Sequence, residues 1–162
     1  MIKNILGSLL LLCTVFVTSI ASAQDQAKKD DDILKGYFAK NKIKATKTPS
    51  GLYYVIHKKG DGENAKAGQQ IGMNYLGRFL DKQRFDGNID ENWVPVPDRR
   101  VLNFTLGIGQ VIKGWDEGIQ LLNKGSRATL YIPSHLAYGP GGRPSIPPNA
   151  ILMFDVELVS KP

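Results

Sequence analysis

The sequence predicts an α+β fold, in which one short helix packs on a face of an antiparallel sheet. Two observations lead to this prediction. Short segments rich in β-branched and aromatic residues recur between glycine and proline turns, and some alternate cleanly between apolar and polar residues. Residues 113–122, between the third and fourth of these segments, have room for only a short helix. Several strands with one helix among them indicate a sheet covered by helix on one side.

The predicted strands are residues 52–57, 71–80, 101–106, 127–132 and 151–159. The fourth places Ala128, Leu130 and Ile132 on one face, and the fifth alternates in the same way with acidic residues facing outward. Two connections, residues 87–100 and 133–149, are long and contain several prolines. Loops of this length in a compact domain commonly carry function.

Residues 1–23 have the pattern of a secretory signal peptide. Lys3 gives the positive start, residues 5–20 are mostly apolar, and Ala-Ser-Ala ending at Ala23 matches a small-residue cleavage site. We therefore expect cleavage between Ala23 and Gln24, and export to the periplasm or out of the cell. The alternative is an uncleaved segment that anchors the chain in a membrane.

A polar segment with a short helix is expected over residues 24–50, before a single domain over residues 51–162. Residues 24–32 are polar and are predicted to be disordered. Beyond them, a helical stripe is formed by Ile33, Leu34, Tyr37 and Phe38. This stripe fits two arrangements, a helix docked on its own domain or a homodimer contact between two copies.

The sequence lacks the residues that several kinds of catalytic and binding site require. Cys13 is the sole cysteine and lies in the signal segment, so the mature chain would have no disulfide and no thiol nucleophile. His57 and His135 are far apart and have no companions at metal-ligand spacing, so we expect no metal and no cofactor. The net charge of +6 is scattered along the chain. This scatter predicts no nucleic-acid partner.

Aromatic residues stand in glycine-punctuated segments along the second half of the chain. The segments are Asn-Tyr-Leu-Gly at 74–77, Arg-Phe-Asp-Gly at 84–87, Gly-Gln-Val-Ile-Lys-Gly-Trp-Asp-Glu-Gly at 109–118, Leu-Ala-Tyr-Gly at 136–139, Ile-Pro-Pro-Asn-Ala at 146–150 and Phe-Asp-Val-Glu-Leu at 154–158. In this order and at this spacing they resemble FKBP-type peptidyl-prolyl cis/trans isomerases. The resemblance covers about residues 51–160.

The resemblance implies a five-stranded half-barrel wrapped on the short helix, and a cofactor-free isomerase of class EC 5.2.1.8 that assists protein folding. Its partners would be proline-containing polypeptides, with macrolides as a class of inhibitor. By this resemblance Asp86, Tyr138 and Ile112 are the catalytic residues, the last two as hydrogen-bond donors to the substrate. The implied substrate-binding residues are Tyr75, Phe85, Leu102, Val111, Trp115, Ile146 and Phe154.

Some positions depart from the family pattern. Leu102 stands where many relatives carry an aromatic residue, and the segment 87–101 is longer than in the best-known members. These departures bear on substrate preference and macrolide binding. The predicted N-terminal helix lies outside the region of resemblance, so we expect catalysis not to depend on it. The rival function is a chaperone or scaffold that binds proline segments in the same groove without turnover.

Overall fold

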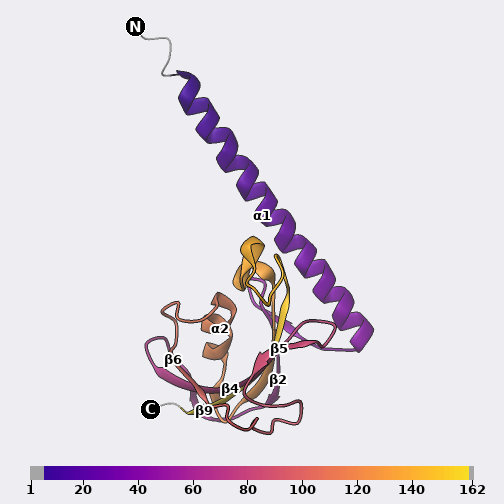
Figure 1. Ribbon diagram of the computed structural model, residues 1–162, viewed down its shortest axis with the longest axis vertical. Coiled ribbons are helices and arrows are strands. Elements are labelled where there is room, and N and C mark those ends of the chain that lie inside the picture. The colour runs from indigo at the N-terminus through magenta and orange to yellow at the C-terminus, as the bar shows by residue number, and fades with distance from the viewer. Residues whose placement is uncertain (1–5, 161–162) are drawn as a thin grey trace.

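The computed structural model describes the backbone of residues 6–160 and the side chains of residues 23–159. Figure 1 shows a curved sheet with a short helix, α2, inside it and a long N-terminal helix, α1, along its outside. The elements in order are α1 (Leu6–Asn41), β1 (Thr46–Lys47), β2 (Tyr53–Lys58), β3 (Asp61–Asn64), β4 (Gln70–Arg78), β5 (Arg84–Gly87), β6 (Leu102–Thr105), α2 (Lys113–Gly118), η1 (Ile119–Leu121), β7 (Asn123–Lys124), β8 (Arg127–Ile132), η2 (Ser134–Leu136), η3 (Gly139–Gly141) and β9 (Leu152–Ser160).

The main sheet is antiparallel and runs in the order β1-β2-β8-β9-β4-β5, with β6 pairing with β4 as well. The predicted strands correspond to β2, β4, β6, β8 and β9, and the α+β fold class is confirmed. The sheet is seven-stranded rather than five-stranded. The additional strands β1 and β5 are two and four residues long, too short to show an alternating pattern.

The inner face of the sheet holds the main core, against which α2 packs. Two glycines of α2, one turn apart, let the helix approach β8 closely. A Cβ atom on Gly114 would lie 2.5 Å from the side chain of Ile132, and one on Gly118 would lie 2.8 Å from that of Leu130. This close approach fixes the depth at which α2 presents Trp115 to the core.

The outer face of the sheet is covered by the C-terminal part of α1. Leu34 and Phe38 are buried there with Tyr53, Tyr131, Ile151 and Met153. Phe38 meets the rings of Tyr53 and Tyr131 edge-on, at centroid distances of 5.0 and 4.9 Å. Within this chain, therefore, α1 docks on its own domain. Ile33, placed on the same stripe by the sequence, is instead 52% exposed.

The prediction of disorder over residues 24–32 is wrong, because this stretch is part of α1. Side chains four residues apart pair along it: Gln26 donates to Asp30, Lys28 pairs with Asp32, and Lys35 pairs with Asp31. Such pairs stabilise a helix, and the stretch contains no glycine or proline to interrupt one. The helix therefore begins far ahead of the apolar stripe.

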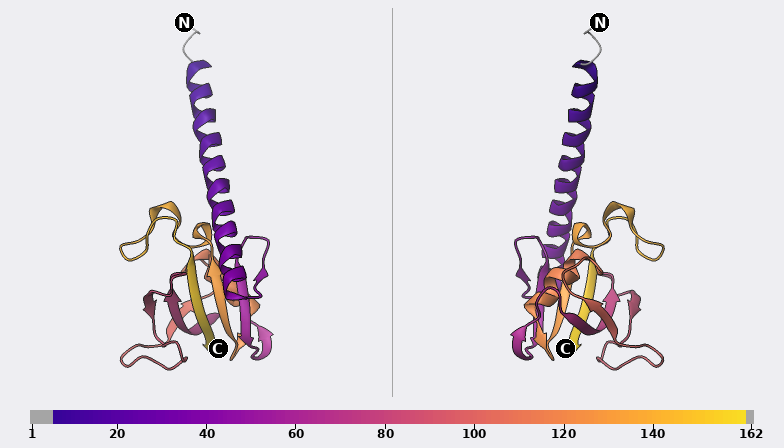
Figure 2. Two further views of the ribbon diagram at one scale, coloured as in Figure 1. Left: turned by 90° about the vertical axis from the view of Figure 1, so that its right-hand side faces the viewer. Right: turned by 90° about the vertical axis from the view of Figure 1, so that its left-hand side faces the viewer.

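Figure 2 shows that α1 extends well beyond the domain on its N-terminal side. The predicted signal peptide falls on residues that lie outside the described side chains, apart from Ala23. In the described part of the chain, no helix is both long enough and apolar enough to cross a membrane.

Candidate active site

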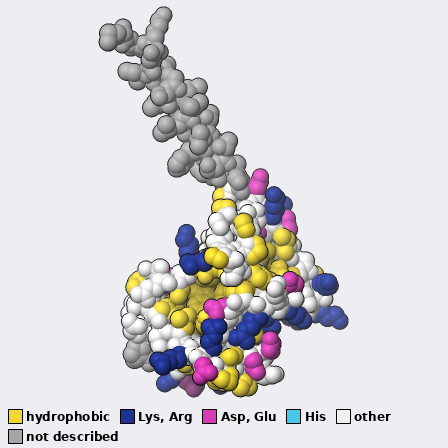
Figure 3. All heavy atoms as spheres, in the orientation of Figure 1, with side chains coloured by type: hydrophobic (Ala, Val, Ile, Leu, Met, Phe, Trp, Pro, Cys, Tyr) yellow, Lys and Arg dark blue, Asp and Glu magenta, His cyan; other side chains and the backbone are white. Residues whose placement is uncertain are grey.

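A pocket of about 400 Å³ opens between α2, β5, β6 and the loop that follows η2. Every predicted site residue lines it: Tyr75, Phe85, Asp86, Leu102, Val111, Ile112, Trp115, Tyr138, Ile146 and Phe154. Gln110, Arg143 and Ser145 complete the lining. Figure 3 shows hydrophobic side chains gathered in a hollow on this face of the molecule. Segments far apart in sequence thus converge on one cavity.

Trp115, on the first turn of α2, lies at the bottom of this pocket and is 4% exposed. Tyr75 and Phe154 meet its ring edge-on, with centroid distances of 5.2 and 5.1 Å and interplanar angles of 80°. Edge-to-face packing of this kind favours a fixed ring orientation. The indole N–H of Trp115 is buried and has no acceptor among the described residues. The floor is therefore formed mainly by closely packed aromatic rings.

One wall of the pocket is formed by the rings of Phe85 and Phe154, which stack edge-on at 5.5 Å. Gly77 makes this packing fit. A Cβ atom at Gly77 would lie 2.7 Å from the ring of Phe85 and 2.8 Å from that of Phe154. The Tyr-Leu-Gly segment of β4 thus places one aromatic ring in the pocket and leaves space for two others.

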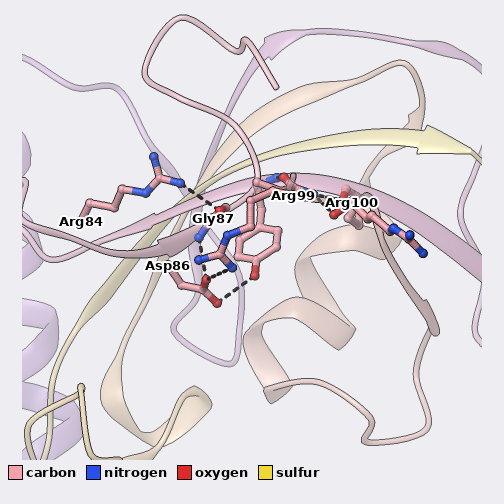
Figure 4. A network of polar contacts seen from close by, with 8 residues as sticks. Arg84, Asp86, Gly87, Arg99 and Arg100 are labelled. Atoms are coloured by element: carbon pink, nitrogen blue, oxygen red, sulfur yellow. Dashed lines mark hydrogen bonds and ion pairs between the residues drawn. The ribbon is translucent and has the colours of Figure 1, made fainter. Parts of the chain in front are cut away.

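Asp86 is the acidic residue of the pocket lining, and its carboxylate is held by several donors (Figure 4). Oδ2 accepts a hydrogen bond from the Tyr75 hydroxyl at 2.8 Å, and Oδ1 accepts one from the Gly87 N–H at 2.8 Å. Nη1 of Arg99 lies 3.6 Å from Oδ1. Burial, and then the bond to Asp86, raise the pKa of Tyr75 well above its usual value. Tyr75 therefore stays protonated and orients the carboxylate.

Two donors at the pocket have no acceptor among the described residues, namely the N–H of Ile112 and the hydroxyl of Tyr138. Ile112 precedes the first turn of α2, and its own carbonyl accepts from the N–H groups of Trp115 and Asp116. Tyr138 follows η2, and the guanidinium of Arg143 lies 4.7 Å from its ring centroid. Both donors are thus available to a carbonyl oxygen that enters the pocket.

A family model described as FKBP-type peptidyl-prolyl cis-trans isomerase matches residues 61–159. The chain belongs to this family. The resemblance seen in the sequence is thereby confirmed. Every residue that lines the pocket lies within the matched region.

Known relatives agree with this membership. The FKBP-type peptidyl-prolyl cis-trans isomerase FkpA of Aeromonas hydrophila is 38% identical over 138 residues, which cover 85% of this chain and 47% of the relative. The crystal structure of FkpA from Escherichia coli superposes with a TM-score of 0.68 at 32% identity, covering 99% of this chain and 73% of that one. AtFKBP13 gives a TM-score of 0.66 at 33% identity, covering 74% of this chain and 100% of that one.

The chain spans about half the length, or less, of the curated relatives it matches. FK506-binding protein 4 of Dictyostelium discoideum, for example, is 42% identical over 69% of this chain but only 29% of its own length is covered. The similarity therefore concerns the FKBP-type domain and, in the bacterial relatives, the segment before it.

Sequence reasoning missed how the long loop after β5 contributes to this FKBP-type domain. Asn88 is buried between β5 and β6, where its amide donates to the carbonyls of Met73 and Arg100 at 3.1 and 2.9 Å. Its Oδ1 accepts from the N–H of Tyr75 at 2.7 Å. Farther along, the loop brings Arg99 to Asp86. The loop therefore supports Tyr75 and Asp86 from outside the recognised motifs.

The two histidines lie away from the pocket lining. His57 contacts the hydroxyl of Thr129 at 2.7 Å, and His135 contacts the carbonyl of Ser50 at 3.0 Å. Among the residues whose side chains are described, no cluster of three or more His, Cys, Asp or Glu could hold a metal ion.

Proposed function

We propose that this chain catalyses cis/trans isomerisation of Xaa-Pro bonds in polypeptides and so assists their folding. The observation that carries the proposal is the pocket itself. It combines an aromatic floor at Trp115, an oriented carboxylate at Asp86 and two available donors at Ile112 and Tyr138. No bond needs to be made or broken in the reaction, so no nucleophile or metal is required.

The barrier to this reaction, about 18–20 kcal/mol, arises because resonance keeps the amide planar. Resonance also places partial negative charge on the carbonyl oxygen, which water stabilises. Twisting about the C–N bond removes part of this charge separation. A pocket that excludes water therefore penalises the planar amide more than the twisted one, and this difference lowers the barrier.

In this reaction Trp115 and the rings around it would hold the proline ring, because flat apolar surfaces suit a pyrrolidine. The Ile112 N–H and the Tyr138 hydroxyl would bind substrate carbonyls and hold the chain in its twisted geometry. Asp86, held by the Tyr75 hydroxyl and the Gly87 N–H, would face the amide as an oriented carboxylate that interacts electrostatically with it and does not transfer a proton.

A non-catalytic chaperone or scaffold is the second candidate, because an apolar groove can bind proline segments without turnover. Exchange NMR on a set of Xaa-Pro peptides separates the two functions. At substoichiometric concentration, an isomerase broadens the cis and trans signals of the peptide or transfers magnetisation between them. A binding module shifts those signals in proportion to occupancy and leaves the exchange rate unchanged. Lys124→Gln, on β7, is a matched surface control that should behave as wild type.

The place of action is proposed to be the periplasm or the exterior of the cell, after cleavage between Ala23 and Gln24. The charge, apolar run and Ala-Ser-Ala site in residues 1–23 support this. Intact mass of the exported protein is the test. A species that retains residues 1–23, or that carries lipid on Cys13, would contradict it.

Two further features belong to the proposal. Macrolide inhibitors are expected to compete with substrate for the pocket, with Leu102 rather than an aromatic residue on one wall, and an inhibition assay measures this. A homodimer through the exposed part of α1 is the second feature. Light scattering of the mature protein would show twice the chain mass if it forms.

A further inference from the structure

Asp30, on α1, is a carboxylate buried in an apolar stripe. It is 1% exposed and precedes Leu34 and Phe38 at intervals of four residues, so all three lie on the face of α1 that meets the domain. Its hydrogen bonds come from neutral groups. Gln26 donates to Oδ1 at 2.7 Å, while the N–H and hydroxyl of Ser134 both donate to Oδ2, at 2.8 and 2.6 Å.

These contacts reach a turn that leads into the pocket. Ser134 opens η2, and its N–H is a first-turn amide that no carbonyl of the turn itself can satisfy. Asp30 supplies the missing acceptor, as a capping residue does, from a position 104 residues earlier in the chain. Figure 2 shows α1 passing beside this part of the domain, and α1 and η2 are in direct contact.

Because Ser134 is held in place, the rest of η2 and the residues that follow it, including Tyr138, are held as well. The carbonyl of Ser134 accepts from the N–H of Ala137 at 3.0 Å, and Leu136 between them is buried in the main core. Tyr138 follows directly and lines the pocket. Beyond it, the carbonyl of Gly139 accepts from the N–H of Asn149 at 2.8 Å. Tyr138 therefore lies between two fixed points of the backbone, η2 and the Gly139–Asn149 hydrogen bond, and the first of these depends on Asp30.

Other parts of α1 keep Asp30 in place. Leu34 and Phe38, one and two turns farther along, are packed against the rings of the outer face, so the helix cannot slide relative to η2. The Asp30 carboxylate adds two hydrogen bonds from Ser134, which begins the turn before Tyr138.

We propose that Asp30 is a positioning residue for catalysis, which fixes η2 and thereby sets the place of the Tyr138 hydroxyl in the pocket. This inference rests on the proposed function, in which that hydroxyl binds the substrate. It makes α1 a working part of the active-site scaffold, against the expectation from the sequence that catalysis does not depend on the helix.

A double-mutant cycle tests the proposal in the mature chain, with kcat and KM measured for wild type, Asp30→Ala, Tyr138→Phe and the double variant. Loss of one neutral hydrogen bond to the substrate corresponds to roughly a twofold to tenfold loss of kcat/KM for Tyr138→Phe. Asp30→Ala should lose a similar factor, mainly in kcat. The double variant should be no slower than the slower single variant, because both substitutions remove the same hydrogen bond between the Tyr138 hydroxyl and the substrate.

Two control variants isolate the contact between Asp30 and Ser134 from other effects of changing α1. Asp30→Asn keeps an acceptor oxygen for Ser134 and should retain most of the wild-type kcat, even if Asp30→Ala folds poorly. Ile33→Ala changes the exposed side of the same helix, away from η2. Its effect on kcat should be small, and it should multiply with that of Tyr138→Phe.

The outcomes are distinct. Factors for Asp30→Ala and Tyr138→Phe that multiply in the double variant, or an Asp30→Asn variant as slow as Asp30→Ala, would overturn the role of Asp30 while leaving the isomerase function standing. A wild-type chain without isomerase activity would instead overturn the proposed function, and the positioning role in catalysis with it.

Discussion

Replacing Phe38 with alanine tests whether α1 is an integral part of the folded domain. The Phe38 ring is 8% exposed and lies within 5.0 Å, centroid to centroid, of both Tyr53 and Tyr131. Truncation of a buried phenylalanine costs about 3–5 kcal/mol of folding free energy. Phe38 lies near the C-terminal end of α1, where neighbouring side chains can close part of the gap. We therefore expect a loss near the lower end, about 3 kcal/mol.

Urea denaturation followed by circular dichroism measures this loss as a lower transition midpoint at unchanged slope. Ile33→Ala is the matched control, because Ile33 lies on the same helix but is 52% exposed. Its effect should stay within about 0.5 kcal/mol, as for most surface substitutions. A loss below about 1 kcal/mol for Phe38→Ala would refute the docking of α1 on the outer face.

The same measurement at two protein concentrations addresses the dimer alternative. Docking within one chain is independent of concentration, whereas a stabilising contact between copies raises the midpoint as protein is added. A midpoint that rises with concentration, together with a large effect of Ile33→Ala, would indicate that the exposed side of α1 contacts a second copy.

Gly77→Ala should lower both stability and kcat/KM, because its methyl group would press on the rings of Phe85 and Phe154. The expected loss of stability is about 1–3 kcal/mol, as for an overpacked core. Gly36→Ala, with open space around it, is the control, and equal effects of the two substitutions would contradict this reasoning. Asn88→Ala removes the hydrogen bonds of the Asn88 side chain to the Tyr75 N–H and to the carbonyls of Met73 and Arg100, and should cost about 2–4 kcal/mol, measured by thermal unfolding. A change within the noise would show that the loop does not support β4. Burial raises the pKa of Tyr131 to about 12. The folded state therefore keeps a proton that the unfolded state releases above about pH 10, so this stability is complete below pH 10 and is lost as the pH rises toward 12, by about 1.4 kcal/mol per pH unit. Tyr131→Phe should flatten that decline, and an unchanged slope would rule out Tyr131 as its cause.

Much of the fold and of the pocket could be predicted because the signals are local or come in a fixed order. Alternation in residues 127–132 and 151–159 predicts β8 and β9 directly. The resemblance of the glycine-punctuated aromatic segments to FKBP-type isomerases predicts which rings line the pocket with Trp115, although these rings lie on β4, β5, α2 and β9.

Other features could not be predicted because nothing near them in the sequence indicates their partners. The contact between Asp30 and Ser134 joins residues 104 positions apart, and an aspartate within a polar helical segment looks like a solvated residue. Asn88 and Arg99 lie in a loop without periodicity. The helical state of residues 24–32 depends on pairs four residues apart and on docking farther along, neither of which an apolar pattern reveals.

The rate of cis/trans exchange in one Xaa-Pro peptide, measured by NMR with the mature chain between about pH 6 and pH 8, tests the isomerase mechanism most directly. Histidine is the side chain that ordinarily titrates in this range, and neither His57 nor His135 lines the pocket. A pocket that acts by desolvation and by binding the twisted amide should accelerate exchange with a kcat/KM that is constant across the range. No acceleration, or a bell-shaped profile that disappears when His57 or His135 is replaced, would contradict this mechanism.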